Sequence, residues 1–297
     1  MLNLDLNLIR TFVVMYETRS TTLCAEKLCV TQPSVSYALG KLREIFNDRL
    51  FVRARGGMEP TELARQIFED LSHSMAQIES TVENARGFVA AKSHRQFTIA
   101  LTDLGEIVQL PLILARLQQQ APNISLKVVN VEIDQIKDWL YSSKVDAVIC
   151  TAQIIDAKIK KRVIFQDHYV CLAAAGQQPM TIDLDGFCNA QHVQISRAVG
   201  HGIVEESLHE LGIKRNIALF LPHFSALPYV LPNTSLLAVV PKSIAHLFCR
   251  NHDLAWCEMP VELPQAEISI YSSQRVDDYP AQRWFIDNVA TALQDGW

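Results

Sequence analysis

The chain lacks the short motifs that mark the common enzyme sites. It contains no G-x-S-x-G, no P-loop, no G-x-G-x-x-G and no H-E-x-x-H, the spacings that place a nucleophile, a phosphate cradle or a zinc ion. His201 and Asp103 are conceivable as an acid and base pair, but each is more simply explained as a loop residue. We therefore predict that the protein is not an enzyme and needs no cofactor.

Clustered cysteines are also missing. The seven cysteines are odd in number and form no C-x-x-C pair and no group with histidine, which argues against a disulfide framework or a metal site. We expect reduced, mostly buried side chains. A redox sensor is the alternative, with Cys171 or Cys188 as the reactive thiol, although neither has a basic flank that would lower its pKa.

No long apolar run is present either. The longest uncharged stretch, residues 216–241, contains four prolines, which would break a membrane helix. The N-terminal residues MLNLDLNLIRTF include Asp5 and no basic segment followed by an apolar one, so they do not resemble a secretory signal. These features predict a cytoplasmic protein without a membrane partner.

Charge is unevenly distributed along the 297 residues. The net charge is −5, yet residues 1–61 hold eight basic and six acidic side chains, which leaves 19 basic and 26 acidic in the rest. The length and the 49% hydrophobic content indicate about two globular domains. A mildly basic N-terminal part on an acidic body fits a nucleic-acid reader that avoids non-specific adhesion.

The segment from Ser20 to Phe46 predicts two helices joined by a tight turn. Ser20 or Thr21 can cap the first helix, and Thr31 can cap the second. Apolar residues recur at helical spacing in both; they are Leu23, Cys24, Ala25 and Leu28, then Val35, Ala38, Leu39 and Leu42. An earlier helix over residues 5–18 would pack across the pair with a stripe of Leu6, Ile9, Phe12, Val13 and Tyr16.

The second helix of this pair presents a polar face at its start. An exposed helix start with amides, hydroxyls and an aromatic ring suits entry into the DNA major groove. An ordinary helical hairpin with a solvated face is the alternative. The predicted DNA-binding side chains of this helix are Gln32, Pro33, Ser34, Ser36, Tyr37 and Lys41.

A basic hairpin follows the helix pair. Residues 50–53 alternate like a short strand, and Gly56 and Gly57 supply a tight turn. Arg53 and Arg55 place two cations beside that turn, where they can contact phosphates or the minor groove. This pattern is typical of the wing of a winged helix.

At this point the chain resembles the LysR-type transcriptional regulators. Three segments match that family's N-terminal pattern in order and spacing over roughly the first 65 residues; they are DLNLIRTFVVMYETRS, AEKLCVTQPSVSYALGKLR and DRLFVRARGGMEPTELA. Three positions depart from it: Cys24 replaces the usual alanine, Tyr37 stands where many relatives have arginine, and Gly40 lies inside the helix. A mid-helix glycine costs about 1 kcal/mol relative to alanine. Because Tyr37 and Gly40 both lie in the helix predicted to enter DNA, base preference and phosphate contacts should differ from the family norm.

The resemblance implies an architecture and a function, that of a sequence-specific transcriptional regulator whose DNA binding or promoter activity is modulated by a small-molecule effector bound between two lobes. The fold class is α/β, with a winged helix-turn-helix domain over 1–61, a linker and dimerisation helix over 62–90, and an effector-binding domain over 91–297. That last domain resembles periplasmic binding proteins, with one lobe at about 95–163 and 268–297 and the other at about 166–264. The implied partners are double-stranded DNA with an interrupted palindrome, a small-molecule effector and a second copy of the chain, with tetramers suggested by the family.

The long helix predicted over 61–86 carries an apolar seam. Its spacing is close to a heptad repeat with one break; the positions are 64, 67, 71, 75, 78, 82 and 85. We interpret the seam as a dimer interface. The alternative is a helix that packs back on its own body.

Strands and helices alternate after residue 95, which predicts an α/β sheet with parallel strands. The expected strands are 97–102, 125–131, 145–150, 162–174, 191–196, 216–221, 236–240 and 267–273. The expected helices are 105–120, 133–142, 203–211, 224–230, 241–250 and 280–294, with an irregular segment at 183–186.

Polar residues follow several of these strands, at the edge where open α/β sheets bind ligands. Thr102 also occupies the place where the family commonly puts a hydroxyl at the effector. Thr102 and Ser225 equally suit helix caps, and Arg197 and His201 suit an anionic group or simply an exposed loop. The predicted effector-binding residues are Thr102, Asp103, Thr151, Ser196, Arg197, His201, His223 and Ser225.

Overall fold

A computed structural model of the chain describes residues 5–54, 57–176, 181–197 and 202–295. The chain divides into two compact units, Met1–Gly87 and Phe88–Trp297. The predicted site residues Arg55 and His201 lie outside the described residues, as does the predicted turn residue Gly56.

The N-terminal unit begins with three helices, which are α1 Leu6–Thr18, α2 Thr21–Leu28 and α3 Gln32–Phe46. The Ser20 hydroxyl accepts the N–H of Leu23 at 3.4 Å. The Thr31 hydroxyl accepts the N–H of Ser34 at 3.4 Å. Both predicted caps are thus confirmed, and each satisfies a backbone donor that the first helical turn leaves free.

The core of this unit forms where the three helices meet. The fully buried side chains are Phe12, Met15, Cys24, Leu42, Leu50 and Ala64. Two residues of the predicted apolar stripes, Leu6 and Leu23, are instead 47% and 51% exposed. Both lie in the first turn of their helices, before the stretches that pack against neighbouring helices, so the predicted stripes were too long at their N-terminal ends.

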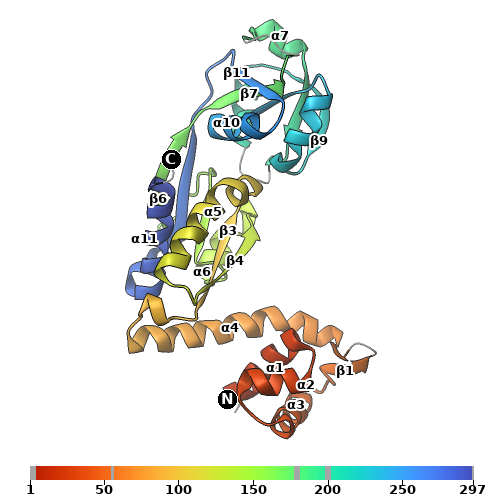
Figure 1. Cartoon of the computed structure of the whole chain (residues 1–297), viewed down its shortest axis with the longest axis vertical. Helices are drawn as coiled ribbons and strands as arrows, with labels where there is room; N and C mark the ends of the chain where they lie inside the picture. Colours follow the sequence, from red (N-terminus) through yellow and green to blue (C-terminus); the bar gives the residue numbers. More distant parts are fainter. Residues whose placement is uncertain (1–4, 55–56, 177–180, 198–201, 296–297) are drawn as a thin grey trace. The chain divides into compact units, whose positions relative to one another are not determined.

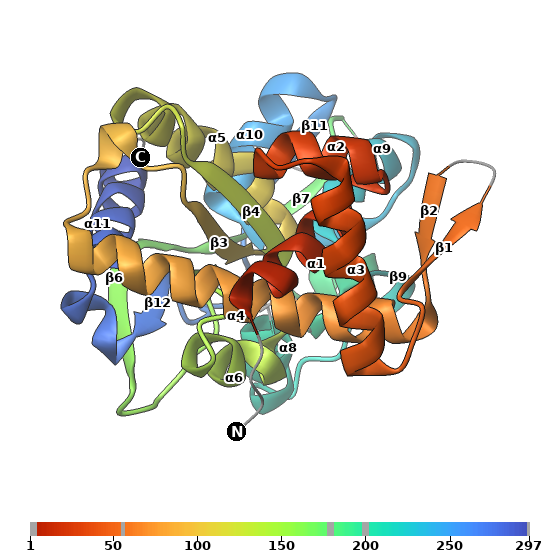
Figure 2. The same cartoon turned by 90° about the horizontal axis from the view of Figure 1, so that it is seen from below.

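The predicted wing is an antiparallel hairpin of β1 Phe51–Ala54 and β2 Gly57–Pro60, which projects beside α3 and α4 in Figure 2. Strand β2 is held to the end of α1 by a bond from the Met58 N–H to the Arg19 carbonyl at 2.9 Å. Gly57 has a φ of +131°, and a Cβ there would lie 2.8 Å from the same carbonyl oxygen. Glycine is therefore required at the point where the hairpin meets α1.

Helix α4, Glu62–Arg86, has two distinct halves. Ala64 is fully buried, and Leu71 and Met75 pack against the core of the N-terminal unit. Ile78 and Val82 are 39% and 46% exposed. The predicted seam is therefore divided: its first half packs on its own domain, whereas Ile78 and Val82 of its second half are exposed.

The second unit contains two five-stranded sheets. The first, in the order β4-β3-β5-β12-β6, belongs to lobe one; its strands are β3 Gln96–Leu101, β4 Ser125–Asn130, β5 Ala147–Cys150, β6 Ile159–Asp167 and β12 Ala266–Ser273. The second, in the order β11-β7-β10-β8-β9, belongs to lobe two; its strands are β7 Tyr169–Ala174, β8 Gln191–Ile195, β9 Asn216–Leu221, β10 Leu237–Pro241 and β11 Leu254–Glu258.

Helices cover these sheets. In lobe one they are α5 Asp103–Gln120, α6 Ile136–Tyr141 and α11 Pro280–Asp295. In lobe two they are α7 Leu184–Asn189, α8 Gly202–Glu210, α9 Leu227–Val230 and α10 Lys242–Asn251. Short 3-10 turns occupy Ala90–Lys92, Ile133–Gln135, Phe224–Ala226, Leu231–Asn233 and Gln274–Asp278.

Both sheets are mixed, which corrects the expected parallel arrangement. Strand β12 runs antiparallel to β5 and β6, and β7 runs antiparallel to β10 and β11. The single strand predicted over 162–174 is two strands in different sheets, β6 and β7, separated at His168. The prediction missed β11, and the segment predicted to be irregular opens α7, whose N-cap is Asp183.

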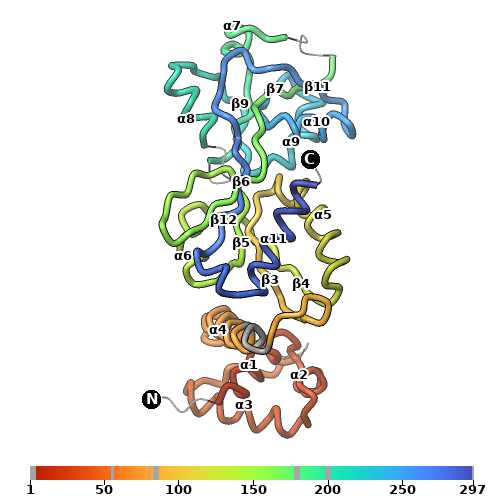
Figure 3. Tube along the Cα trace, turned by 90° about the vertical axis from the view of Figure 1, so that its left-hand side faces the viewer, coloured from red at the N-terminus to blue at the C-terminus, as the bar shows by residue number. Residues whose placement is uncertain are grey.

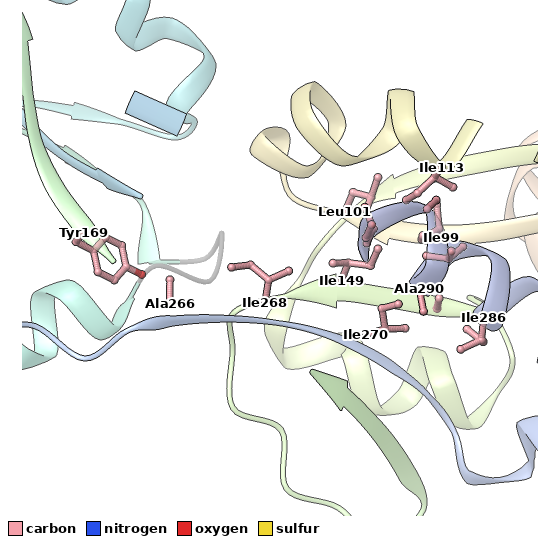
Figure 4. Close-up of a cluster of buried hydrophobic side chains, with 14 of the residues drawn as sticks. Ile99, Leu101, Ile113, Ile149, Tyr169, Ala266, Ile268, Ile270, Ile286 and Ala290 are labelled. Atoms are coloured by element: carbon pink, nitrogen blue, oxygen red, sulfur yellow. The ribbon is translucent and has the colours of Figure 1, made fainter. Parts of the chain in front are cut away.

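Strands β6 and β12 lie side by side and carry the chain between the lobes, as Figures 1 and 3 show. Their register runs from Ala266 opposite Asp167 to Ser273 opposite Ile159. One hydrophobic cluster follows this connection, with Ile99, Ile149 and Ile270 at its lobe-one end and Tyr169 at its lobe-two end (Figure 4). The two lobes therefore share apolar packing along the crossing strands.

Candidate functional site

The start of α3 is an exposed polar surface over a buried apolar face. Four residues of the helix are buried toward the core, at the positions predicted: Val35, Ala38, Leu39 and Leu42. The opposite face is exposed at all five predicted positions near the start of the helix: Gln32, Pro33, Ser34, Ser36 and Tyr37. The Tyr37 side chain is 69% exposed, which leaves its ring and hydroxyl open to a partner.

Hydrogen bonds hold several of these polar side chains in place. The Gln32 amide nitrogen lies 3.4 Å from the hydroxyl oxygens of both Thr21 and Ser36. The Ser34 hydroxyl lies 2.8 Å from that of Thr31. Gln32 thus bridges α2 and α3, so its amide is oriented before any ligand arrives.

The two described cations predicted here have different surroundings. Lys41 is paired with Glu44 at 2.7 Å, and this bond raises the pKa of the Lys41 ammonium. Arg53 is exposed on β1, and the described residues offer it no ion pair or side-chain hydrogen bond. Arg53 is therefore free to bind an anion, whereas Lys41 must first leave Glu44.

Sequence reasoning missed Arg43, which joins α3 to the wing. Its guanidinium donates to the carbonyls of Arg49 and Phe51 at 2.9 and 3.4 Å. Arg43 therefore fixes the hairpin relative to α3. Only the fold brings these carbonyls to α3, so spacing in the sequence gave no sign of this role.

A narrow cavity of about 40 Å³ lies between the lobes of the second unit. Two helices, α5 and α10, begin at its wall, and the crossing strands close another side. Its lining is mostly apolar, and the residues are Thr102, Leu104, Gly105, Val108, Gln109, Ile149, Cys150, Thr151, Phe165, Asp167, Pro241, Ser243, Ile244 and Ile268. A lining of this composition suits an apolar body with a few polar groups, but about 40 Å³ is far below the volume of a small-molecule site, so the lobes must separate to admit one.

Two of the predicted effector residues, Thr102 and Thr151, line this cavity. The Thr102 hydroxyl caps α5 by accepting the N–H of Gly105 at 3.2 Å, so the capping role expected as an alternative is confirmed. A capping hydroxyl keeps its own hydrogen, which it can still donate.

Asp103 and Ser225 lie in contact, but they bond to each other and do not line the cavity. The Asp103 carboxylate accepts the backbone N–H of Ser225 at 2.9 Å, which joins α5 of lobe one to lobe two. The other carboxylate oxygen of Asp103 is buried without a partner among the described residues. This hydrogen bond links the two lobes beside the cavity.

The remaining described residues predicted at the effector lie outside the cavity lining. They are Ser196, Arg197 and His223. Arg197 is exposed, and His223 is half-buried. The strand ends that carry them therefore do not reach the same space as Thr102 and Thr151.

Gln109 is the cavity residue that sequence reasoning missed. Its side chain is 9% exposed, and its amide oxygen is buried without a partner among the described residues. A Cβ on Gly105, one turn earlier, would lie 3.0 Å from that oxygen, so glycine gives the amide its space. No local sequence pattern distinguishes this buried glutamine in mid-helix from one that is exposed to solvent.

An internal carboxylate occupies the start of α10 at the cavity wall. Asp167 accepts the N–H groups of His168 and Ser243 at 2.8 and 3.1 Å. A carboxylate at a helix N-terminus is favoured by the helix dipole. The partial positive charge at the start of α10 is thus already paired with a carboxylate of the protein.

The cysteines match the expectation in part. Cys24, Cys150, Cys171 and Cys257 are buried, whereas Cys29 is exposed. Burial raises the pKa of the Cys150 thiol to about 11. Among the described residues, no three His, Cys, Asp or Glu side chains are grouped to hold a metal ion, and no helix is long and apolar enough to cross a membrane.

Two family models match the chain. The model described as bacterial regulatory helix-turn-helix protein, lysR family, matches residues 6–65, and the model described as LysR substrate binding domain matches residues 90–294. Together they span the helix-turn-helix and wing and nearly all of the two-lobed unit.

Characterised relatives and solved structures agree with these models. The chain is 35% identical to the HTH-type transcriptional activator NahR of Pseudomonas putida over 274 residues, 91% of each chain. It is 30% identical to the HTH-type transcriptional activator NagR of Ralstonia sp, over 95% of each chain. The crystal structure of the probable transcriptional regulator PA0477 from Pseudomonas aeruginosa has a TM-score of 0.82 at 27% identity over 96% of each chain. CbnR, a LysR family regulator solved in complex with its target DNA, shares the fold at a TM-score of 0.67 and 16% identity, over 97% of this chain and 100% of that one.

Proposed function

Because the chain belongs to the LysR family of bacterial transcriptional regulators, we propose that α3 and the wing read operator DNA while the cavity between the lobes receives a small effector. The protein is a DNA-binding regulator with an effector-binding domain, and it is not an enzyme. The observation that carries the proposal is the exposed polar start of α3, supported on a buried apolar face within a matched helix-turn-helix. Its place of action is the cytoplasm, where promoter DNA is found.

At the DNA, base reading and phosphate binding fall to different side chains. Gln32, Ser36 and Tyr37 carry amide or hydroxyl groups at the helix start, the part that reaches base edges in helix-turn-helix proteins. Arg53 on the wing is an unpaired cation and suits a phosphate. Pro33, Ser34, Lys41 and Arg55 complete the proposed interface.

Changing Gln32 to alanine is expected to relax sequence preference at one base pair of each half-site, by about 1–3 kcal/mol. The amide is the group placed to read a base, and it is already oriented by Thr21 and Ser36. Binding to a panel of operators with single substitutions measures this. A uniform loss of affinity across the panel would contradict base reading by Gln32.

Changing Arg53 to alanine is expected to weaken binding to all sequences alike and to reduce the salt slope by about 1. The reason is the loss of one phosphate contact together with its counterion release. Affinity measured over a range of salt concentrations tests it, with the exposed cation Arg250 of the second unit changed to alanine as the control. Unchanged affinity and slope in the Arg53 variant would remove the wing from the interface.

The proposed effector contacts are Thr102, Thr151 and Gln109, around an apolar body. The bond between Asp103 and Ser225 then belongs to the closed arrangement of the lobes, and an effector acts by binding one arrangement better than another. Ser196, Arg197 and His223 lie outside the lining, so they are not among the proposed contacts.

Changing Gln109 to leucine is expected to stabilise the effector-free protein by about 1 kcal/mol and to abolish its response to effector. A buried acceptor without a partner costs about 1–3 kcal/mol, and leucine removes it. Urea unfolding measures the first effect. Promoter output measures the second, with an inducer found by screening small organic compounds.

The exposed residue Gln118 on the same helix, changed to leucine, is the matched control and should change neither property. A Gln109 variant that is less stable than the parent would show that its amide oxygen is satisfied in the free protein. A variant that keeps the full response would remove Gln109 from the effector site.

A further inference from the structure

Three sulfur atoms meet on one face of the lobe-two sheet, away from the effector cavity. Cys171 on β7 lies directly opposite Cys257 on the edge strand β11. Met259 follows two residues later, just past the end of β11. The Sγ atom of Cys171 is 3.3 Å from the Sδ atom of Met259.

This cluster is buried in the hydrophobic core. Cys171 and Cys257 are 1% and 7% exposed, and Met259 packs against the same cluster. An apolar surrounding excludes water and so strengthens any bond between a thiolate and a cation.

The Cys171 thiol faces both of the other sulfur side chains. It donates a hydrogen bond to the Met259 sulfur, and it lies opposite Cys257 in the register of β7 and β11. The side chains that the geometry brings together are therefore two thiols and one thioether.

We propose that Cys171, Cys257 and Met259 form a binding site for a soft monovalent metal ion, Cu(I). Thiolate and thioether sulfur are the ligands that Cu(I) favours. A disulfide would use the two cysteines and leave the methionine contact without a role. Zinc needs three or four ligands drawn from cysteine, histidine and carboxylate side chains, and the described residues group no three His, Cys, Asp or Glu side chains.

Binding at this site is an exchange of protons for metal. Cu(I) takes the positions of the protons held by Cys171 and Cys257, those protons pass to solvent, and no electron is transferred. The metal would pin the edge strand β11 to β7. It would also hold Met259, where the chain leaves lobe two for β12.

The test is a titration of the reduced full-length chain with Cu(I) in the absence of air, against bicinchoninate as a coloured competitor. We expect one ion to be withdrawn from the competitor per chain. Changing Cys257 to serine should weaken binding by roughly 100-fold or more, and changing Met259 to leucine by about 10-fold. Cys249, changed to serine, lies outside the cluster and is the matched control.

Leucine nearly conserves the volume of methionine, so the Met259 variant keeps the core packed. X-ray absorption of the copper-loaded parent gives an independent measurement that needs no variant, with three sulfur neighbours expected around the metal. Equal binding by the parent and the Cys257 variant, unchanged affinity in the Met259 variant, or fewer than three sulfur neighbours would each overturn the proposal. Reduced parent protein that withdraws no Cu(I) from the competitor would do the same.

Discussion

Changing Ile78 and Val82 together to aspartate is expected to split the regulator into monomers and to weaken operator binding by about 100-fold or more. Both residues lie in the second half of α4, one turn apart on one face, and both are exposed within the N-terminal unit. A pair of large apolar side chains at this spacing is half of a helix-to-helix seam. Two carboxylates there would have to be buried unpaired in a dimer, which costs several kcal/mol.

Affinity falls with the dimer because the two reading heads act as one ligand. In a dimer, binding of the first α3 and wing raises the effective concentration of the second at its half-site. A twofold dimer also predicts an operator that is an interrupted palindrome, with half-sites separated by one helical turn of DNA or a multiple of it. Separated monomers lose this advantage and retain only the affinity of one half-site.

The earlier seam position Leu71 provides an informative contrast. Its side chain packs against the core of its own unit, so an aspartate there should unfold the helix-turn-helix rather than simply separate the subunits. Ala76 is exposed on the same helix, on a different face, and its change to aspartate is the matched control. Sedimentation and operator titration measure assembly and affinity.

A persistent dimer in the Ile78 and Val82 variant would place the interface elsewhere in the chain. Loss of the dimer in the Ala76 control would show that any added negative charge on α4 disrupts assembly. Only separation in the first variant and not in the control identifies the second half of α4 as the seam.

The N-terminal unit was largely predictable because its signals are local. Thr31 caps the helix that Pro33 helps to start, and the buried positions of α3 follow helical spacing. Arg43 was not predictable, because its two carbonyl partners belong to the wing and its approach. The exposure of Leu23 was missed for a similar reason, since spacing identifies an apolar face but not where the neighbouring helices end.

In the second unit, the sequence indicated where strands lie but not which sheet they join. The apolar run over 162–174 crosses from one sheet to the other at His168, and alternation alone cannot show that change of partner. The missed strand β11 pairs with β7, about eighty residues earlier in the chain. Pairing over such a distance depends on the whole fold rather than on the local pattern.

The candidate effector site was predictable where it follows strand ends. Thr102 and Thr151 follow β3 and β5, whose carboxyl ends meet at one edge of a sheet, and both reach the cavity. Arg197 follows β8 in the other lobe but is exposed outside the lining. Gln109 reaches the cavity from the middle of α5, a position that depends on how tightly the lobes pack.

Acidification from pH 7 to pH 4 is expected to destabilise the second unit by about 3 kcal/mol through His192 alone. This histidine lies on β8 and is fully buried. Its Nε2 atom is 2.7 Å from the Phe187 carbonyl, and its Nδ1 atom is buried without a partner among the described residues. The neutral ring therefore donates from Nε2, and a second proton on Nδ1 would place a charge in the core.

Burial lowers the pKa of His192 to about 4, and the nearby Arg215 guanidinium acts in the same direction. The unfolded chain binds the proton with a pKa of about 6.5. Between these two values the unfolded state holds more protons than the folded state, so the free energy of unfolding falls as the pH falls. The stabilisation that depends on the neutral His192 ring is constant above about pH 6.5 and is largely lost by pH 4.

Urea unfolding followed by tryptophan fluorescence measures this effect in the right part of the chain, because all four tryptophans lie in the second unit. Carboxylates also titrate in this range, so the comparison is with a His192 to glutamine variant, which keeps a donor for the Phe187 carbonyl but binds no proton. The parent should lose about 3 kcal/mol more than the variant between pH 7 and pH 4. Parallel curves for the two proteins would mean that the ring is protonated in the folded state or reached by water, and the buried neutral histidine would have to be abandoned.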